Sequence, residues 1–339
     1  MSVLDYYKGK WVLVTGGTGL IGRAIVDMLV DAGAYVSCVS RDSLKLRDNV
    51  TYIYGNLADL SFCQEISRSQ DIIFHMAGIK GSPVVTKSRP ASFLVPLLMM
   101  NTNMLEAARV NNVPRLLYAS SIGAYPMAEE FKEYESGGWV EAPMDEFPGW
   151  AKRMAEMQIE AYRQEFGIHG YSIVRPANVY GPGDNFDPDS AMVIPALLAR
   201  AHKGENPLKV WGDGKAIRDF AYSEDVAYGM LQAVASEIPD LFVNLGSGLE
   251  RTVREVAENV SIITGCRLQF QPQTGDNAFS RRVMSIEKAR NLIGYNPTTS
   301  LYDGMKKTWD WFLEHSEEHL LKQNYFREWS LTDARQTVG

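Results

Sequence analysis

A glycine-rich segment, Gly16-Gly17-Thr18-Gly19-Leu20-Ile21-Gly22, has the spacing that points most directly to chemistry in this 339-residue chain. Glycines three residues apart allow a tight turn and let the backbone approach a ligand closely. The segment follows a short β-branched apolar run and opens a stretch with apolar residues at helical spacing. Amides at the start of a helix can hold a pyrophosphate, so the sequence predicts a dinucleotide site here; a purely structural turn is the alternative.

The tip of the next expected strand would face the adenosine ribose of such a dinucleotide. It reads Val39-Ser40-Arg41-Asp42. Ser40 and Arg41 suit a 2′-phosphate, because a guanidinium donates charge-assisted hydrogen bonds to phosphate oxygens. Asp42 would favour an unmodified ribose if it turned inward. The sequence therefore leans modestly to NADP(H) and leaves NAD(H) open.

Strands and helices that alternate along the first half must position these residues. Apolar patterns predict strands at 11–15, 35–39, 51–54, 71–75, 116–119 and 171–175, with helices at 20–32, 60–68, 91–111 and 150–166. Such alternation implies a parallel sheet with helices on both faces. The predicted fold class is α/β, a Rossmann-type doubly wound parallel sheet with a smaller, mostly C-terminal substrate-binding domain.

The second half is less regular, with helices expected at 191–203, 223–236, 252–264 and 301–315. The strand expected at 242–245 can return to the first sheet. We therefore assign residues 1–176 to a dinucleotide-binding domain and 177–320 to a substrate domain partly interleaved with it. Residues 321–339 are assigned to a C-terminal tail.

Composition narrows the possible partners and location. A net charge of −7 offers no basic surface for nucleic acid. The most apolar stretch, 93–100, is too short to span a bilayer, and the first residues do not resemble a signal peptide, so we expect a cytoplasmic protein. The three cysteines show no metal-ligand spacing, no metal is expected, and Cys38 and Cys266 are predicted to be buried thiols.

Several further segments resemble the extended short-chain dehydrogenase/reductases, the family of sugar-nucleotide epimerases, dehydratases and reductases. They are the glycine turn, Gly55-Asn56-Leu57-Ala58-Asp59, Phe74-His75-Met76-Ala77-Gly78, Ala119-Ser120-Ser121, Lys152, Arg175-Pro176-Ala177-Asn178-Val179-Tyr180-Gly181-Pro182 and Arg218-Asp219-Phe220. Within the family, the stretches 180–188 and 193–198 are most similar to the GDP-L-fucose synthases. Trp211-Gly212-Asp213-Gly214 is similar to the plant GDP-mannose 3,5-epimerases.

The resemblance implies two sets of binding residues. The cofactor would contact Gly16, Thr18, Gly19, Leu20, Ile21, Gly22, Ser40, Arg41, Asn56, Leu57, Asp59, Ala77, Gly78, Lys152, Pro176 and Val179. The nucleotide-sugar substrate would contact Ser121, Asn178, Val193, Arg200, Trp211, Arg218 and one of Arg281 and Arg282. The guanidinium group of arginine forms paired hydrogen bonds with diphosphate oxygens, which is the physical reason for the arginines in this second set.

The same resemblance implies a catalytic Ser121 and Lys152, with a tyrosine four residues before the lysine that moves a proton as hydride is transferred. Pro148 stands at that place, between Phe147 and Gly149. None of these three residues has a titratable hydroxyl. The sequence thus predicts that the usual tyrosine is missing.

Other positions at which the family has a proton-transfer residue also differ in this chain. The fucose synthase pattern has a cysteine after the serine pair and a histidine before Val-Ile-Pro, where this chain has the Ile122-Gly123 region and Met192. The Asp-Glu pair of the family's dehydratases, which follows the serine position, is also missing. The chemistry that this site performs therefore stays open at this point.

Three hypotheses follow. A replacement acid or base, among Tyr125, Tyr134, Asp145 and Glu146, supports an NAD(P)-dependent oxidoreductase or epimerase acting on a nucleotide-diphosphate sugar, with GDP-sugars favoured. Alternatively, Lys152 or a substrate hydroxyl acting through water moves the proton. In the third, the chain binds cofactor and sugar nucleotide but is catalytically weak or inactive, as a sensor or partner subunit.

Two smaller predictions concern packing. His75 ends an expected strand with no second histidine nearby, so it is predicted to be packed or hydrogen-bonded rather than a ligand. By resemblance, the helices at 93–111 and 150–166 would pair with those of a second copy in a four-helix bundle, which implies a homodimer.

Overall fold

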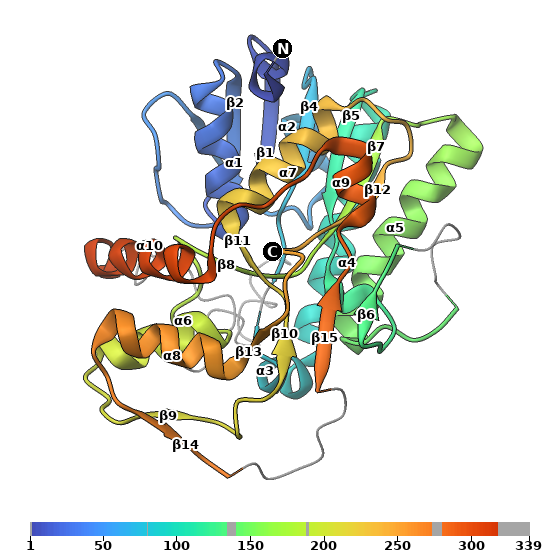
Figure 1. The fold of residues 1–339 in the computed structure, drawn as a ribbon. Helices are drawn as coiled ribbons and strands as arrows, with labels where there is room; N and C mark the ends of the chain where they lie inside the picture. The colour runs from blue at the N-terminus through green and yellow to red at the C-terminus, as the bar shows by residue number, and fades with distance from the viewer. Residues whose placement is uncertain (1, 80, 134–139, 188–189, 273–279, 318–339) are drawn as a thin grey trace, which may run out of the picture.

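The computed structural model describes residues 2–79, 81–133, 140–187, 190–272 and 280–317 (Figure 1). Its centre is a seven-stranded sheet in the order β12-β7-β5-β4-β1-β2-β3, with every neighbouring pair parallel. The strands are β1 (Trp11–Thr15), β2 (Tyr35–Ser40), β3 (Thr51–Tyr54), β4 (Ile72–His75), β5 (Arg115–Ala119), β7 (Tyr171–Pro176) and β12 (Phe242–Leu245). The predicted Rossmann-type sheet is confirmed, including the return of β12 from the second half of the chain.

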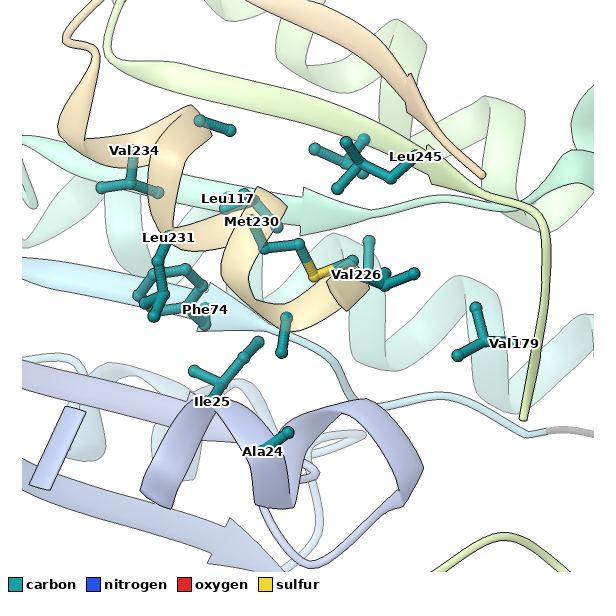
Figure 2. Close-up of a cluster of buried hydrophobic side chains, with 14 of the residues drawn as sticks. Ala24, Ile25, Phe74, Leu117, Val179, Val226, Met230, Leu231, Val234 and Leu245 are labelled. Carbon is teal, nitrogen blue, oxygen red and sulfur yellow. The ribbon is translucent and has the colours of Figure 1, made fainter. Parts of the chain in front are cut away.

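Helices cover both faces of this sheet, as its apolar strands require. On one face α1 (Leu20–Asp31) packs beside α7 (Ser223–Ala235), and Figure 2 shows Ile25, Met230 and Leu231 from these helices meeting over Phe74. The other face is covered by α2 (Leu60–Ile66), α4 (Pro90–Val110) and α5 (Glu146–Phe166). A buried layer on each side holds the carboxyl ends of the strands in place.

Helix α5 begins at Glu146, four residues earlier than the pattern predicted. Pro148 therefore lies in its first turn, where the missing amide of proline costs little because no carbonyl precedes it in the helix. The helix ends at Gly167, whose φ of 66° is the left-handed conformation that glycine adopts freely. Pro148 is thus held on a helix rather than in a loop.

A smaller set of elements packs below the sheet in the view of Figure 1. Helices α6 (Val193–His202), α8 (Val253–Thr264) and α10 (Leu301–Glu314) share one apolar cluster there. Four short strands form a second sheet in the order β13-β10-β15-β6, namely β6 (Glu130–Phe131), β10 (Ile217–Arg218), β13 (Arg251–Thr252) and β15 (Arg281–Met284). The parallel pair β6 and β15 joins residues 153 positions apart, such as Glu130 and Val283, which ties the two halves together.

The elements that the sequence pattern missed are short. They include α3 (Pro83–Ser88), α9 (Glu287–Ile293), the pair β8 (Asn178–Tyr180) and β11 (Phe220–Tyr222), and the pair β9 (Leu208–Val210) and β14 (Leu268–Phe270). Two short 3₁₀ turns, η1 (Val3–Tyr7) and η2 (Ile122–Ala124), complete the described elements. Two or three residues carry too little periodicity to identify a strand.

The smaller predictions about buried polar groups are confirmed. The His75 ring is fully buried, with Nδ1 2.8 Å from Thr15 Oγ1 and Nε2 3.0 Å from Asn101 Oδ1. Burial lowers its pKa to about 3, so the ring is neutral. Cys38 and Cys266 are buried free thiols, and the described residues contain no cluster of metal-ligating side chains.

Candidate active site

A cavity of about 1250 Å³ opens at the carboxyl ends of the central strands. Its walls come from the turns after β1, β2, β3 and β4, the ends of β5 and β7, the start of α5, and α6. In open parallel sheets this edge is where ligands bind. The volume exceeds the range of ordinary single-ligand pockets, so two ligands can meet inside it.

The glycine turn forms one end of the cavity and has no room for side chains. Gly16 has a φ of 67°, and a Cβ there would lie 2.9 Å from the Ala77 Cα. A Cβ on Gly22 would overlap the carbonyl group of Gly16, 2.9 Å from its carbon. Gly19 then caps α1 without a side chain, which leaves the first amides of that helix open toward the cavity. This cradle fits a dinucleotide pyrophosphate.

At the tip of β2, Asp42 is drawn toward the glycine turn. Thr18 Oγ1 donates to Asp42 Oδ2 at 3.0 Å and lies 2.8 Å from Ser40 Oγ. The Asp42 amide in turn donates to Ser40 Oγ at 3.2 Å. Ser40, Arg41 and Asp42 all line the cavity, so the tip presents a carboxylate beside the arginine.

Lys152 projects from α5 into the middle of the cavity. Its Nζ donates to the carbonyl of Ala119 at 2.6 Å and lies 5.0 Å from the centre of the Tyr118 ring. Burial lowers the pKa of Lys152 to about 8, against the opposing pull of Glu156 one turn along the helix. The ammonium is fixed at the ends of β5 and β4, within reach of a ligand bound on the glycine turn.

A buried ion pair sits directly behind Lys152. Arg175 of β7 donates to both carboxylate oxygens of Glu156, at 2.9 and 2.5 Å, and Ser120 Oγ donates to the same group at 2.5 Å. Both charged side chains are at most 2 % exposed. Charges buried so deeply are tolerated only when paired, so this network locks α5 against β5 and β7.

Asp145 and Ser121 share one wall of the cavity, at η2. Ser121 Oγ accepts from the Gly123 amide at 3.0 Å, and the Asp145 amide donates to the Gly123 carbonyl at 3.1 Å. The Asp145 carboxylate lies in the space that a side chain at position 123 would take, with its Cγ 2.5 Å from an ideal Cβ there. Desolvation raises the pKa of Asp145, while the charge of Arg282 opposes the shift.

The structure separates the four residues considered as a replacement acid or base. Tyr125 is fully buried away from the cavity and donates to Asn244 Oδ1 at 2.8 Å. Glu146 is exposed, outside the described residues that line the cavity, and Tyr134 lies outside the described residues. Asp145 alone of the three described candidates lines the cavity, and Pro148 lines it beside Asp145.

The far end of the cavity carries positive charge. Arg218 lines it and is anchored by donating to the Ile217 carbonyl at 2.7 Å. Burial and the neighbouring Arg282 lower the pKa of Arg218 to about 10. The buried Nε of Arg282 has no hydrogen-bond partner within the described part of the chain. The guanidinium of Arg218 at the cavity wall, with the positive charge of Arg282 acting on it, suits an anionic ligand.

Most of the sequence-predicted binding residues come together in this one cavity. Those that line it are Gly16, Thr18, Gly19, Leu20, Ile21, Gly22, Ser40, Arg41, Asn56, Leu57, Ala77, Gly78, Ser121, Lys152, Pro176, Asn178, Val179, Val193 and Arg218. They come from segments more than 200 residues apart.

Five predicted residues are placed elsewhere among the described residues. Asp59 caps α2 by accepting from the amides of the two residues at 61 and 62, and Trp211 is 82 % exposed. Arg200 pairs with Glu205 at 2.7 and 2.5 Å, and Arg281 pairs with Glu250. Arg282 lies behind Arg218 rather than on the cavity surface.

Other lining residues were not foreseen. They include Ser82 and Thr86 of the α3 region, Met99 and Met100 of α4, and His202 and Lys203 at the end of α6. No motif marks them, because their place in the wall depends on how α3, α4 and α6 pack around the cavity. The sequence holds no local signal that would have identified them.

Comparison with known proteins agrees with this geometry. The model of the NAD-dependent epimerase/dehydratase family matches residues 12–246. The chain belongs to this family. The Escherichia coli GDP-L-fucose synthase is 31 % identical over 326 residues, covering 90 % of this chain and 97 % of that protein.

Solved structures of family members have the same fold. An epimerase from Methanothermobacter thermautotrophicus superimposes with a TM-score of 0.84 at 26 % identity, covering 94 % of this chain and 96 % of the other. A Thermotoga maritima UDP-glucose 4-epimerase, solved with UDP-glucose, gives 0.78 at 27 % identity, covering 90 % and 99 %. In the described residues, no helix combines the length and apolar character needed to cross a bilayer.

Proposed function

We propose that this chain is an NAD(P)-dependent oxidoreductase or epimerase that acts on a nucleotide-diphosphate sugar, and that its proton-transfer group is not the usual tyrosine. The observation that carries the proposal is the arrangement of one continuous cavity. The glycine turn, Ser121, Lys152 and Arg218 all line it. A sugar held by its diphosphate at Arg218 would extend toward a nicotinamide held near Lys152.

The nicotinamide cofactor would supply the hydride acceptor or donor when bound. The chain's own residues would do the rest. The ammonium of Lys152, fixed on the Ala119 carbonyl, would hold the nicotinamide ribose and favour negative charge nearby. Ser121 would donate a hydrogen bond to the reacting oxygen of the sugar, while the paired Arg175 and Glu156 keep α5 in register.

A GDP-linked sugar is the favoured substrate. The support comes from the likeness to GDP-L-fucose synthases over nine tenths of the chain, together with the matching stretches at 180–188 and 193–198. Val193 and Asn178 line the end of the cavity beside Arg218, where the nucleotide would lie.

For the cofactor, Ser40 and Arg41 favour NADP(H), whereas the Asp42 carboxylate at the same tip opposes a 2′-phosphate. Asp42 is held toward the glycine turn by Thr18, so its charge would meet the phosphate directly. We therefore propose that NAD(H) is preferred over NADP(H), with Asp42 as the deciding residue.

A homodimer in the cytoplasm is proposed as the working form. Apolar side chains of α4 and α5 that do not line the cavity, among them Val110, Met154 and Met157, are between 38 and 46 % exposed. Pairing these two helices with those of a second copy would cover them. Sedimentation at micromolar concentration should give twice the chain mass, and Met154→Glu combined with Met157→Glu should give the monomer.

Pro148 favours a second candidate, a binding protein with little or no turnover. It lines the cavity four residues before Lys152, and its ring cannot move a proton. Such a protein would sense the nucleotide sugar or act as the silent partner of an active subunit.

One experiment separates the two. The protein is incubated with NAD⁺ or NADP⁺ and a panel of GDP-, UDP-, TDP- and CDP-hexoses, following nicotinamide absorbance and solvent deuterium uptake into the sugar carbons. Reduction of the cofactor or deuterium uptake with a GDP-hexose supports the enzyme. Tight binding without either signal across the panel supports the binding protein and contradicts the enzyme.

A further inference from the structure

The proposed reaction needs a group that takes the hydroxyl proton as the hydride leaves, and Pro148 cannot take it. The described residues that line the cavity include the carboxylates of Asp42, Asp145, Asp184, Asp187 and Glu317, and that of Asp145 lies against Gly123 of η2, two residues after Ser121. This inference rests on the proposed function and names its proton-transfer residue.

Two glycines make the position of Asp145 possible. Gly123 leaves open the space that the carboxylate fills, because any Cβ there would collide with it. Gly149 lets the first turn of α5 approach η2, since a Cβ on it would lie 2.6 Å from both the Gly123 carbonyl oxygen and the Pro143 Cβ. The Asp145 amide donates a hydrogen bond of 3.1 Å to the Gly123 carbonyl. The Gly149 amide donates one of 3.1 Å to the Asp145 carbonyl, which completes the contact between α5 and η2.

The Asp145 carboxylate at this junction does not cap the helix that follows it. Asp145 is the residue before the first turn of α5, yet its side chain makes no capping bond to the helix amides. Throughout the described ranges it has no hydrogen-bond or ion-pair partner, and its surface is open to the cavity. A capping role, the ordinary reason for an aspartate at this position, is thus excluded.

The surroundings of Asp145 suit proton transfer. Although Asp145 is exposed to the cavity, desolvation raises the pKa of its carboxyl, which makes it a stronger base than a free aspartate. The charged neighbour that acts on it is Arg282 of β15, whose guanidinium lowers the pKa and keeps the shift moderate. Ser121 stands on the same wall, joined to Asp145 through the backbone of Gly123.

We infer that Asp145, seated in the space left by Gly123, is the general base and acid of this site. In the oxidative direction, the hydroxyl proton of the sugar passes to a carboxylate oxygen of Asp145. The hydride leaves the same sugar carbon with its electron pair for the oxidised nicotinamide, and the carbon–oxygen bond becomes a carbonyl. In the reductive direction both return, so the carboxylate ends as it began.

Three variants test the assignment. Asp145→Asn keeps the shape of the side chain and removes its basicity, so kcat for nicotinamide reduction with the active GDP-hexose should fall roughly 100- to 10,000-fold. Gly123→Ala keeps the carboxylate but displaces it, so the kcat of this variant should fall to a similar level. Glu146→Gln, the neighbouring exposed carboxylate, is the matched control and should keep the wild-type kcat.

The double variant, Gly123→Ala with Asp145→Asn, should be no slower than Asp145→Asn alone, because both changes remove one interaction. Calorimetry should show cofactor and GDP-hexose binding to each variant as to the wild type, which excludes misfolding. The wild-type kcat should also rise with pH through an ionisation that Asp145→Asn loses.

A second measurement does not depend on turnover. Infrared difference spectra between wild type and Asp145→Asn isolate the Asp145 carboxylate band, and Gly123→Ala should shift that band. An unshifted band would contradict the placement of the Asp145 carboxylate in the space left by Gly123.

Each outcome on activity is decisive. An active wild type with an equally active Asp145→Asn would overturn the assignment and leave the proposed function standing. A wild type that binds both ligands but turns over none of the panel would overturn both.

Discussion

The two halves of the cavity are built in different ways. The cofactor half rests on one contiguous segment, Gly16 to Gly22, in which backbone alone shapes the cradle. The half proposed for proton transfer is assembled from side chains of distant segments: Ser121 beside η2, Asp145 just before α5, Lys152 on α5, and Arg282 on β15. The proposed cofactor cradle is therefore a local feature of the chain, whereas the proposed catalytic group depends on how distant elements pack together.

The contrast explains why the two halves can diverge separately. A backbone cradle tolerates few changes, because a single Cβ at Gly16 or Gly22 collides with neighbouring backbone. A wall made of side chains can exchange one carboxylate or hydroxyl for another if the space permits. The pairing of Gly123 with Asp145 is such an arrangement.

The largest expected effect comes from breaking the support of the proton-transfer half. Glu156→Gln leaves the buried Arg175 without its charge partner, and should lower the free energy of unfolding by about 3–5 kcal/mol. Glu205→Gln is the matched control, since the more exposed pair with Arg200 should contribute about 1 kcal/mol or less. Urea unfolding of both variants measures the difference; equal losses would show that this half gains nothing from its buried pair.

The cofactor half should fail through binding rather than stability. Gly22→Ala pushes a methyl group against the Gly16 carbonyl and should weaken cofactor binding by about 3 kcal/mol, roughly 100-fold in Kd. Gly204→Ala, at a glycine with open space around it, should keep the wild-type Kd in calorimetry and cost only some stability. If both variants bind the cofactor alike, the cradle is not where the pyrophosphate rests.

Within the cofactor half, Asp42 should set the choice between the two nicotinamide cofactors. Asp42→Ser removes the charge opposing a 2′-phosphate, and should raise the preference for NADP⁺ over NAD⁺ by about 10-fold, or 1.4 kcal/mol. Competition binding of the two cofactors gives the ratio directly. Arg41→Ser should move it the other way, and an unchanged ratio in both variants would remove the tip of β2 from cofactor selection.

The smallest expected effect, that of a tyrosine introduced in place of Pro148, best tests whether the proton-transfer half already works without one. Pro148→Tyr restores a hydroxyl four residues before Lys152, in the first turn of α5. If Asp145 already carries the proton, kcat with the GDP-hexose should change by less than about threefold, about 0.7 kcal/mol in the barrier. Activity that appears only in Pro148→Tyr would instead favour the binding protein described above.

Much of the fold was predictable because the parallel strands are apolar and the helices long. The boundaries of β1 and β3 matched the prediction, whereas α5 begins at Glu146, four residues before the predicted start at 150. The two-residue strand β6 was not predicted, since the strand it pairs with in the described structure lies 153 residues away.

The candidate site divides in the same way. Most of the binding residues that the motifs predicted line the cavity, but the predicted set also included Trp211 and Arg200, which the structure places outside the described lining. The four candidate bases were equivalent in sequence. Packing distinguished the three that lie in the described residues, by burying Tyr125 against Asn244, leaving Glu146 outside the cavity lining and opening Asp145 to the cavity.

By itself, the sequence determined the cradle and the sheet, because glycine spacing and apolar periodicity are local properties of the chain. It also determined that a hydroxyl is missing before Lys152. Only the tertiary structure brought Asp145, the proton-transfer group proposed above, to the cavity wall, because the closeness of Asp145 to Gly123 arises from the start of α5 packing on η2. Such a contact joins segments that no local pattern connects, on a helix that the buried Arg175–Glu156 pair also ties to the sheet.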